Sequence, residues 1–244
     1  MRVEPYGVGS VLHVIKRGAR GMDIVRDEGD CWRFVRSLYL LNDHFQDLHR
    51  DHRYLGKSDM PKLSGRERLF ARPPEWPERK PLVAILGWTL VQNHFHLLIQ
   101  EIMEGGLSKF MQRFCNSMTR SHNEKQGEIG SLFQGAYKSR TVDSDEYLQY
   151  VHAYITVKNT LENYPGGLEA AIGNFDDAWQ WAHEQYPFSS FVTSATGADS
   201  VILDMNAMRS LGLFRKDFKH YAKSMLATHA DTREDLAHLL LETW

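Results

Sequence analysis

The stretch from Leu82 to Gln100 constrains the fold most, because it holds two strand-like runs with a short break between them. The runs are LVAILGWTLV and FHLLIQ, and Gln92 and Asn93 lie between them. Residues of these two types favour a tight turn or a bulge between strands. The pattern therefore predicts a central β-hairpin.

Strand and helix patterns alternate on both sides of this hairpin. Strand composition occurs at Ser10 to Lys16 and at Leu132 to Val142. Helical spacing of apolar residues occurs from a cap at Asp27 or Asp30 to about Phe45, from Leu107 to Met118, and after Ser144. The resulting order predicts an α+β fold with a ferredoxin-like antiparallel sheet whose helices pack on one face.

The remaining sequence divides into an insertion and an extension. Residues 49–81 are polar and contain five prolines, which exclude a long regular element. We therefore predict one domain over residues 1–194, with a Pro-rich insertion at about 49–81. Residues 195–244 are predicted to form a helical C-terminal extension. A chain of 244 residues is long enough for one sizeable core.

Composition limits the classes of function and the location. The formal net charge of -2 provides no overall positive field, so any nucleic-acid site must be local. The two cysteines, Cys31 and Cys115, lack CxxC spacing, which argues against a disulfide framework or a thiolate zinc site. The sequence shows no signal-peptide pattern and no apolar run long enough to span a bilayer. We expect a cytoplasmic protein with no membrane partner.

Two histidines, His94 and His96, lie in the second run of the hairpin. Alternation along a strand places both imidazoles on one face and Phe95 on the other. Imidazole suits manganese, iron, cobalt or zinc, and magnesium is tolerated where oxygen ligands complete the shell. The spacing alone is compatible with a metal clamp and also with two exposed strand histidines.

The segments GWTLVQNHFHLLIQ, LFQGAYKSRTVDSDEYLQYVHAYI and YPFSSF make a wider comparison possible. They resemble the single-tyrosine transposases of the HUH superfamily, named for a His-hydrophobe-His motif, and in particular the REP-associated tyrosine transposases. The resemblance runs from about Ser10 to Phe191. Gln92 stands where proline is common in that family, and Ala136 stands where arginine is common.

The resemblance implies a transposase that nicks single-stranded DNA and transfers the strand. Tyr154 matches the nucleophile, whose oxygen attacks a phosphodiester and leaves a 5′-phosphotyrosine and a free 3′-hydroxyl; Tyr150 is a rival. His94 and His96 match the ligands of a divalent metal, Mg²⁺ or Mn²⁺, that polarises the scissile phosphate. The implied partner is single-stranded or hairpin DNA, and the sequence also allows a homodimer.

The sequence departs from the family pattern just after Tyr154. Lys158 lies four residues on, where a Gln or Asn often completes the metal shell, and a charged lysine has no lone pair to donate. One hypothesis makes Lys158 catalytic, because it would stabilise the ionised tyrosine or contact the phosphate; the alternative is solvent exposure. A second hypothesis places Asn159, one position later, on the metal through a local helix distortion.

Basic residues next to the matched segments are predicted to contact DNA phosphates. They are Lys16 and Arg17 in the first strand, and Lys138 and Arg140 in the strand before the tyrosine helix. His13 alternates along the first strand, where it either flanks the site or serves a structural role.

Two other classes of function stay open. The first is a catalytically inactive nucleic-acid-binding module of the same fold, which Lys158 favours. The second is a small zinc-binding regulator with no DNA role. A covalent adduct with single-stranded DNA would distinguish the enzyme from both.

Overall fold

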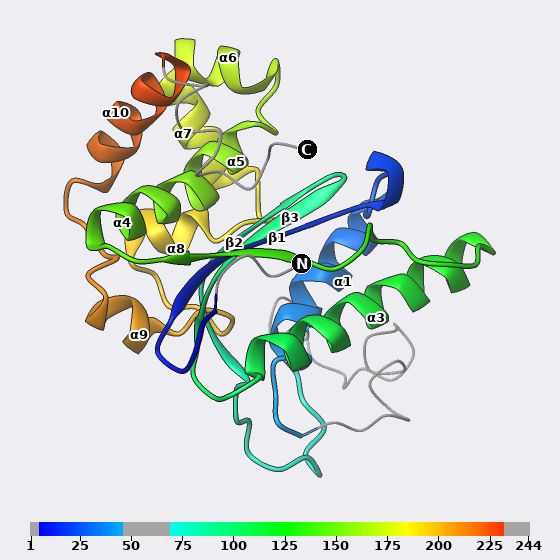
Figure 1. The fold of residues 1–244 in the computed structure, drawn as a ribbon. Helices are drawn as coiled ribbons and strands as arrows, with labels where there is room; N and C mark the ends of the chain where they lie inside the picture. The colour runs from blue at the N-terminus through cyan, green and yellow to red at the C-terminus, as the bar shows by residue number, and fades with distance from the viewer. Residues whose placement is uncertain (1–4, 46–68, 232–244) are drawn as a thin grey trace.

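A four-stranded antiparallel sheet forms the centre of the computed structural model, which describes residues 5–45 and 69–231 (Figure 1). Its strands are β1 (Val11–Arg17), β2 (Val83–Val91), β3 (His94–Glu101) and β4 (Lys138–Val142). They lie in the order β2-β3-β1-β4, and every neighbouring pair is antiparallel. This is the ferredoxin-like order, so the predicted fold class is confirmed. β2 and β3 form the predicted hairpin.

Two helices, α1 (Glu28–Leu40) and α3 (Gly106–Gln126), cover one face of the sheet (Figure 1). The side chain of Asp27 caps α1 by accepting a hydrogen bond from the Asp30 amide at 3.0 Å. The rings of Phe34 in α1 and Phe114 in α3 lie 5.1 Å apart, and both contact Phe95 of β3. All three side chains are fully buried, so aromatic packing fixes this layer on the sheet.

Helices that follow β4 cover the other face of the sheet (Figure 1). They are α4 (Asp145–Ala153), the π-helical turn η3 (Tyr154–Lys158), α5 (Asn159–Leu161), α6 (Gly167–Gly173), α7 (Phe175–Glu184), α8 (Phe191–Thr196), α9 (Met205–Ser210) and α10 (Phe218–Asp231). The sequence predicted helices on one face of the sheet, and α1 and α3 lie there. The tyrosine helix and those after it form a second layer, which buries the histidine-bearing face.

The described part of the C-terminal extension packs into the domain. Met208 of α9 belongs to the apolar core around the sheet. Phe218 and Met225 of α10 belong to a second core, which they share with Val157 and Phe191. Within residues 5–45 and 69–231, no helix is both long and apolar enough to cross a membrane.

Three predicted segments differ from the observed ones in length or coverage. The strand expected from Leu132 begins only at Lys138, and a single bridge from Phe133 to Gly18 precedes it. The first helix ends at Leu40 instead of about Phe45. Of the predicted insertion, residues 69–81 form no strand and no long helix, and residues 49–68 lie outside the described residues. A short 3₁₀ turn, η1 (Ala19–Gly21), follows β1.

Candidate active site

The face of the sheet opposite α1 and α3 carries three histidines. His94 and His96 share one face of β3, as alternation predicts, and β1 adds His13 on the same side. In the antiparallel register, Ile15 lies opposite His96 and Arg17 lies opposite His94. His13 and His96 are fully buried, and His94 is 9% exposed. The histidines therefore lie beneath the second helical layer and not on an open strand surface.

The segment above these histidines changes from α-helical to π-helical geometry at Tyr154. The amide of Asn159 donates to the carbonyl of Tyr154, five residues earlier, where an α-helix would use a residue four earlier. The Thr89 hydroxyl of β2 donates to the carbonyl of Ile155, which ties this turn to the sheet. The helix distortion that the sequence hypothesis required is therefore present.

Gly87 lets the turn approach β2 closely. A Cβ at this position would lie 3.2 Å from Thr156 Cγ2 and 3.5 Å from His152 Cδ2. A side chain at this position would therefore require Thr156 to shift by a few tenths of an ångström.

Tyr154 lies directly beside the histidines. Its ring centroid is 6.1 Å from that of His13 and 6.1 Å from that of His96, both in edge-on arrangements. Tyr150, the rival nucleophile, stacks on the outer side of Tyr154 with ring centroids 6.2 Å apart. Tyr154 is fully buried. The geometry therefore brings Tyr154 next to the histidines.

Lys158 points at the tyrosine hydroxyl and is not exposed to solvent. Its Nζ donates to Tyr154 Oη at 3.2 Å and forms an ion pair with Glu162 Oε1 at 2.7 Å. Lys158 is 3% exposed. The sequence reasoning missed Glu162, although a Lys and a Glu four residues apart on a helix are a recognised pairing signal.

Asn159 has a buried side-chain amide with no bonded partner. Neither Oδ1 nor Nδ2 has a hydrogen-bond partner among the described residues, and the side chain is fully buried. A buried amide without partners is costly and calls for an explanation such as an ion or a ligand. The position after the π turn and the orphaned oxygen fit the hypothesis that Asn159 completes a metal site.

The two predicted histidine ligands are held at their Nδ1 atoms. His94 Nδ1 lies 2.7 Å from Asn93 Oδ1, and His96 Nδ1 lies 2.9 Å from His13 Nε2. Burial, followed by the nearby His94, holds the pKa of His96 well below its ordinary value, so the ring is neutral and suited to ligation. With Nδ1 engaged in each ring, Nε2 is the atom that would face a metal.

The donor set therefore fits a divalent cation, with two imidazoles and an amide oxygen as ligands. Within the described ranges, no group of three or more His, Cys, Asp or Glu side chains is arranged to hold a metal ion. Asn159 is not one of these four residue types, and it would bind a metal through its amide oxygen.

The predicted basic residues fall on two different faces of the sheet. Arg17, Lys138 and Arg140 lie on the histidine face, since Lys138 is opposite Ile15 and Arg140 is opposite His13. Partial burial and the adjacent Arg17 guanidinium lower the pKa of the Lys138 ammonium. Lys16 points the other way, where its Nζ donates to the carbonyls of Gln134 and Gly135. Strand alternation thus separates Lys16 from the other three.

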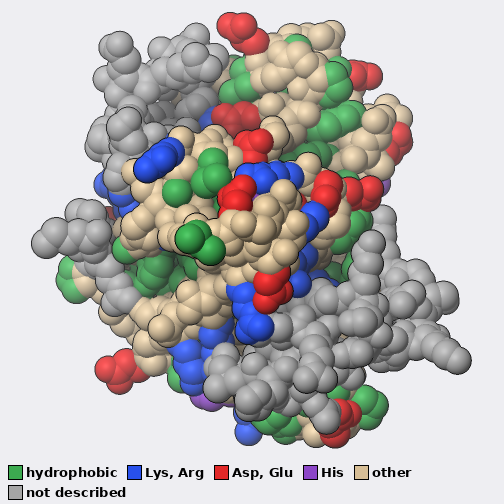
Figure 2. Space-filling view, turned by 90° about the vertical axis from the view of Figure 1, so that its right-hand side faces the viewer, with side chains coloured by type: hydrophobic (Ala, Val, Ile, Leu, Met, Phe, Trp, Pro, Cys, Tyr) green, Lys and Arg blue, Asp and Glu red, His purple; other side chains and the backbone are tan. Residues whose placement is uncertain are grey.

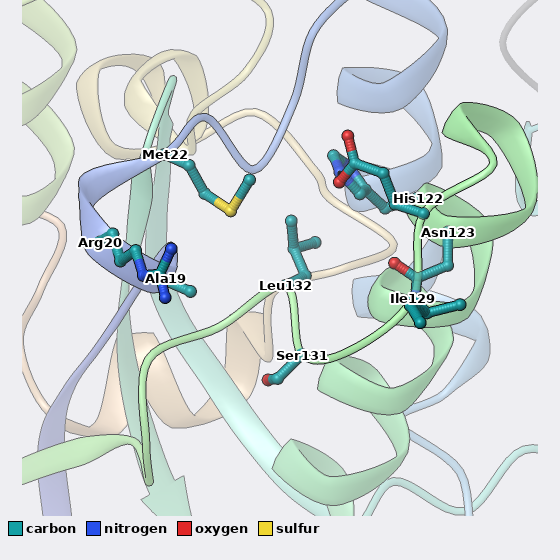
Figure 3. A pocket seen from close by; sticks show the side chains of 9 residues that line it. Ala19, Arg20, Met22, His122, Asn123, Ile129, Ser131 and Leu132 are labelled. Atoms are coloured by element: carbon teal, nitrogen blue, oxygen red, sulfur yellow. Dashed lines mark hydrogen bonds and ion pairs between the residues drawn. The ribbon is translucent and has the colours of Figure 1, made fainter.

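Figure 2 shows one face of the molecule, on which Lys and Arg side chains lie next to Asp and Glu side chains. A pocket of about 380 Å³ lies between η1 and the C-terminal end of α3, with Arg20, Met22, Asn123 and Leu132 around it (Figure 3). None of the predicted site residues lines this pocket.

Comparisons with known proteins point to a transposase family. Residues 77–158, which include both histidines and Tyr154, match the family model described as "Transposase IS200 like". No curated protein matches the chain significantly. A solved structure of a REP-associated tyrosine transposase bound to a REP hairpin has 12% identity and a TM-score of 0.44, covering 82% of this chain and 88% of that one. Over residues 77–158 the chain is similar to IS200-like transposases, and the resemblance to single-tyrosine transposases that its motifs predicted is confirmed.

Proposed function

We propose that the protein nicks single-stranded DNA and transfers the strand in a metal-dependent reaction with Tyr154 as the nucleophile. One observation carries the proposal: the π turn places the Tyr154 ring 6.1 Å from the ring of His96, on the face that also carries His94. A nucleophile beside a pair of potential metal ligands is an arrangement suited to phosphodiester cleavage.

In the proposed step, Tyr154 Oη attacks the phosphorus of the scissile phosphodiester. The oxygen–phosphorus bond to tyrosine forms as the bond from phosphorus to the 3′ oxygen breaks, and the phenol proton passes to solvent. The products are a 5′-phosphotyrosine on the protein and a protonated 3′-hydroxyl on the DNA. Attack by a 3′-hydroxyl on the phosphotyrosine reverses these changes and joins the strand. The tyrosine ester conserves the bond energy, so the cycle needs no nucleotide cofactor.

Lys158 is the residue proposed to assist Tyr154. Its ammonium donates to Tyr154 Oη at 3.2 Å, and a positive charge in this place stabilises a developing phenolate. Glu162 holds the ammonium from the other side at 2.7 Å. Since Tyr154 is fully buried in this structure, DNA must displace part of the covering layer before the hydroxyl can react.

His94, His96 and Asn159 are the residues proposed to hold the divalent metal, Mg²⁺ or Mn²⁺. When bound, such a cation polarises the scissile phosphate and neutralises charge that builds on its oxygens. Asn93 orients the imidazole of His94 through the hydrogen bond at Nδ1.

Arg17, Lys138 and Arg140 are proposed to bind the DNA backbone next to the reacting phosphate. They share the histidine face, and β4 is only partly buried, so a single strand can reach it from that edge. With a formal net charge of -2, the chain depends on this local group to attract a polyanion.

The test is formation of a covalent protein–DNA adduct. We expect the full chain, incubated with labelled single-stranded hairpin DNA and Mn²⁺, to give an adduct that survives denaturing electrophoresis. Tyr154→Phe should abolish the adduct while leaving DNA binding intact, because only the nucleophilic oxygen is lost. Tyr150→Phe is the matched control and should retain it.

Two results would contradict the proposal. Tight DNA binding without an adduct would support a catalytically inactive module. An adduct that persists in Tyr154→Phe and disappears in Tyr150→Phe would assign the nucleophile to the neighbouring tyrosine.

A further inference from the structure

His13 of β1 makes a direct side-chain contact with one of the proposed metal ligands. Its Nε2 lies 2.9 Å from His96 Nδ1, and the two rings are stacked with centroids 5.2 Å apart and planes inclined by 25°. Both side chains are fully buried, and 83 residues separate them in sequence. Water does not compete with a hydrogen bond in such a position, so this contact fixes the orientation of both rings.

We propose that His13 is a positioning residue that selects the tautomer and the orientation in which His96 ligates a divalent metal. The inference rests on the proposed function, since it assumes that His96 is a ligand. It goes further by assigning a role to a residue that does not itself touch the metal or the DNA.

The chemistry of a neutral imidazole explains why such a partner is needed. A neutral ring carries its proton on one nitrogen and its lone pair on the other, and the hydrogen bond at one nitrogen decides which is which. When His96 donates from Nδ1 to His13 Nε2, its lone pair lies at Nε2, on the side away from His13. In the opposite tautomer, Nε2 of His96 carries the proton and cannot bind a metal.

The fold brings His13 to His96 from a neighbouring strand. His13 and His96 belong to adjacent strands, β1 and β3, on the same face of the sheet. The ring of Tyr154 lies 6.1 Å from both rings, so one cluster contains the positioning residue, the ligand and the nucleophile. Outer-shell partners of histidine ligands typically change metal affinity by about 10- to 100-fold when they are removed.

The experiment measures Mn²⁺ affinity of the DNA-free full chain by electron paramagnetic resonance, which needs no catalytic turnover. His13→Leu removes the acceptor, and we expect its affinity for Mn²⁺ to fall by about 10- to 100-fold. His13→Gln places an amide where the ring Nε2 was and should restore most of the affinity. His13→Asn is polar but too short to reach His96, so it should behave like His13→Leu.

The comparison of His13→Gln with His13→Asn tests whether His13 positions His96, even if His13→Leu does not fold. Equal Mn²⁺ affinity in the Gln and Asn variants would overturn the inference. The matched control is His122→Gln, which changes another buried histidine, bonded to Glu128 outside the site, and should leave Mn²⁺ affinity unchanged.

Failure of the proposed function gives a different result. In that outcome, His94→Ala and His96→Ala bind Mn²⁺ as well as the unmodified chain does. If these two variants lose Mn²⁺ while every His13 variant keeps it, only the role of His13 is wrong.

Discussion

Adjacent residues on β1 show how strand geometry separates charges with different roles. Arg17 lies on the histidine face opposite His94, whereas Lys16 is 5% exposed on the other face and bound to backbone carbonyls. Burial lowers the pKa of the Lys16 ammonium, which is partly offset by the nearby Cys115. One residue of register thus decides whether a positive charge lies on the face of the candidate site or packs over Phe133.

Replacing Arg17 with alanine should weaken binding of single-stranded DNA and reduce its dependence on salt. Each phosphate contact contributes a slope of about -0.7 in a plot of log affinity against log salt concentration for single strands. We expect the slope for Arg17→Ala to be shallower by about that amount. Titration of a fluorescent oligonucleotide at several salt concentrations measures it. Lys16→Met is the control, and an equal change in both variants would refute the assignment by face.

The π turn η3 is the element that positions Asn159 relative to Tyr154 in the candidate site. It adds one residue to the helical register, so Asn159 follows Tyr154 by five residues yet shares a backbone hydrogen bond with it. Thr156 and Thr160 donate to the carbonyls of His152 and Thr156 at 2.7 Å each, and such bonds loosen an α-helix. We infer that Lys158, the last residue of the turn, is the one that this extra length accommodates.

Deleting Lys158 should convert η3 into a regular α-helical turn without disturbing the helix that follows. Asn159 would then lie four residues after Tyr154, where Gln or Asn is common in the family that the chain resembles. We expect the deletion variant to keep its melting temperature and its Mn²⁺ affinity, measured by circular dichroism and electron paramagnetic resonance. Loss of the Lys158 contact should still slow adduct formation.

A deletion in the regular part of the same helical segment is the matched control. Removing Gln149 from α4 rotates all later residues of the segment by about 100° relative to the earlier ones, which misplaces Tyr154. That variant should unfold at a lower temperature and lose Mn²⁺ binding. If the Lys158 deletion is equally damaging, the turn is not a one-residue insertion.

At the scale of the whole molecule, the second helical layer closes over the site and joins it to the C-terminal helices. His152 of α4 lies where these parts meet: its Nε2 is 3.1 Å from Ser194 Oγ of α8, and its ring is 5.5 Å from that of Phe218 in α10. Complete burial lowers the pKa of His152 to about 4. Assembly of the layer thus depends on a neutral ring.

Stability should therefore fall as the pH falls from about 6.5 to about 4. In this window the unfolded chain binds a proton at His152 and the folded chain does not. Protonation therefore stabilises the unfolded state relative to the folded state. The pKa of His152 is about 6.5 in the unfolded chain and about 4 in the folded chain. This pKa difference corresponds to a loss of about 3 kcal/mol in the free energy of unfolding across the window. Urea unfolding at several pH values should show a shallower pH dependence for His152→Gln.

The control for this measurement is His220→Gln, which replaces an exposed histidine of α10. Its pH dependence should match that of the unmodified chain. An unchanged slope in His152→Gln would show that other groups cause the acid sensitivity.

Much of the fold followed from local patterns in the sequence. Strand composition and turn residues predict the hairpin because their effects act within a few positions. Helix capping is also local, so the sequence narrows the cap of the first helix to Asp27 or Asp30, and the structure has Asp27. Alternation put His94 and His96 on one face, since a strand has a fixed period of two. The strand expected from Leu132 was too long, because its first residues have strand composition but make only one bridge to β1.

The contacts that complete the candidate site were decided by the tertiary structure. The sequence kept two roles open for His13, and the pairing of β1 with β3 brought it to His96. It also kept Lys158 between catalysis and solvent. The four-residue offset brings the ammonium to Tyr154, and tertiary packing buries it away from solvent. The sequence by itself determined which residue types are present and their local periodicity. Long-range packing determined which residues are buried and which distant ones meet, such as His13 and His96, because those distances depend on elements far apart in the chain.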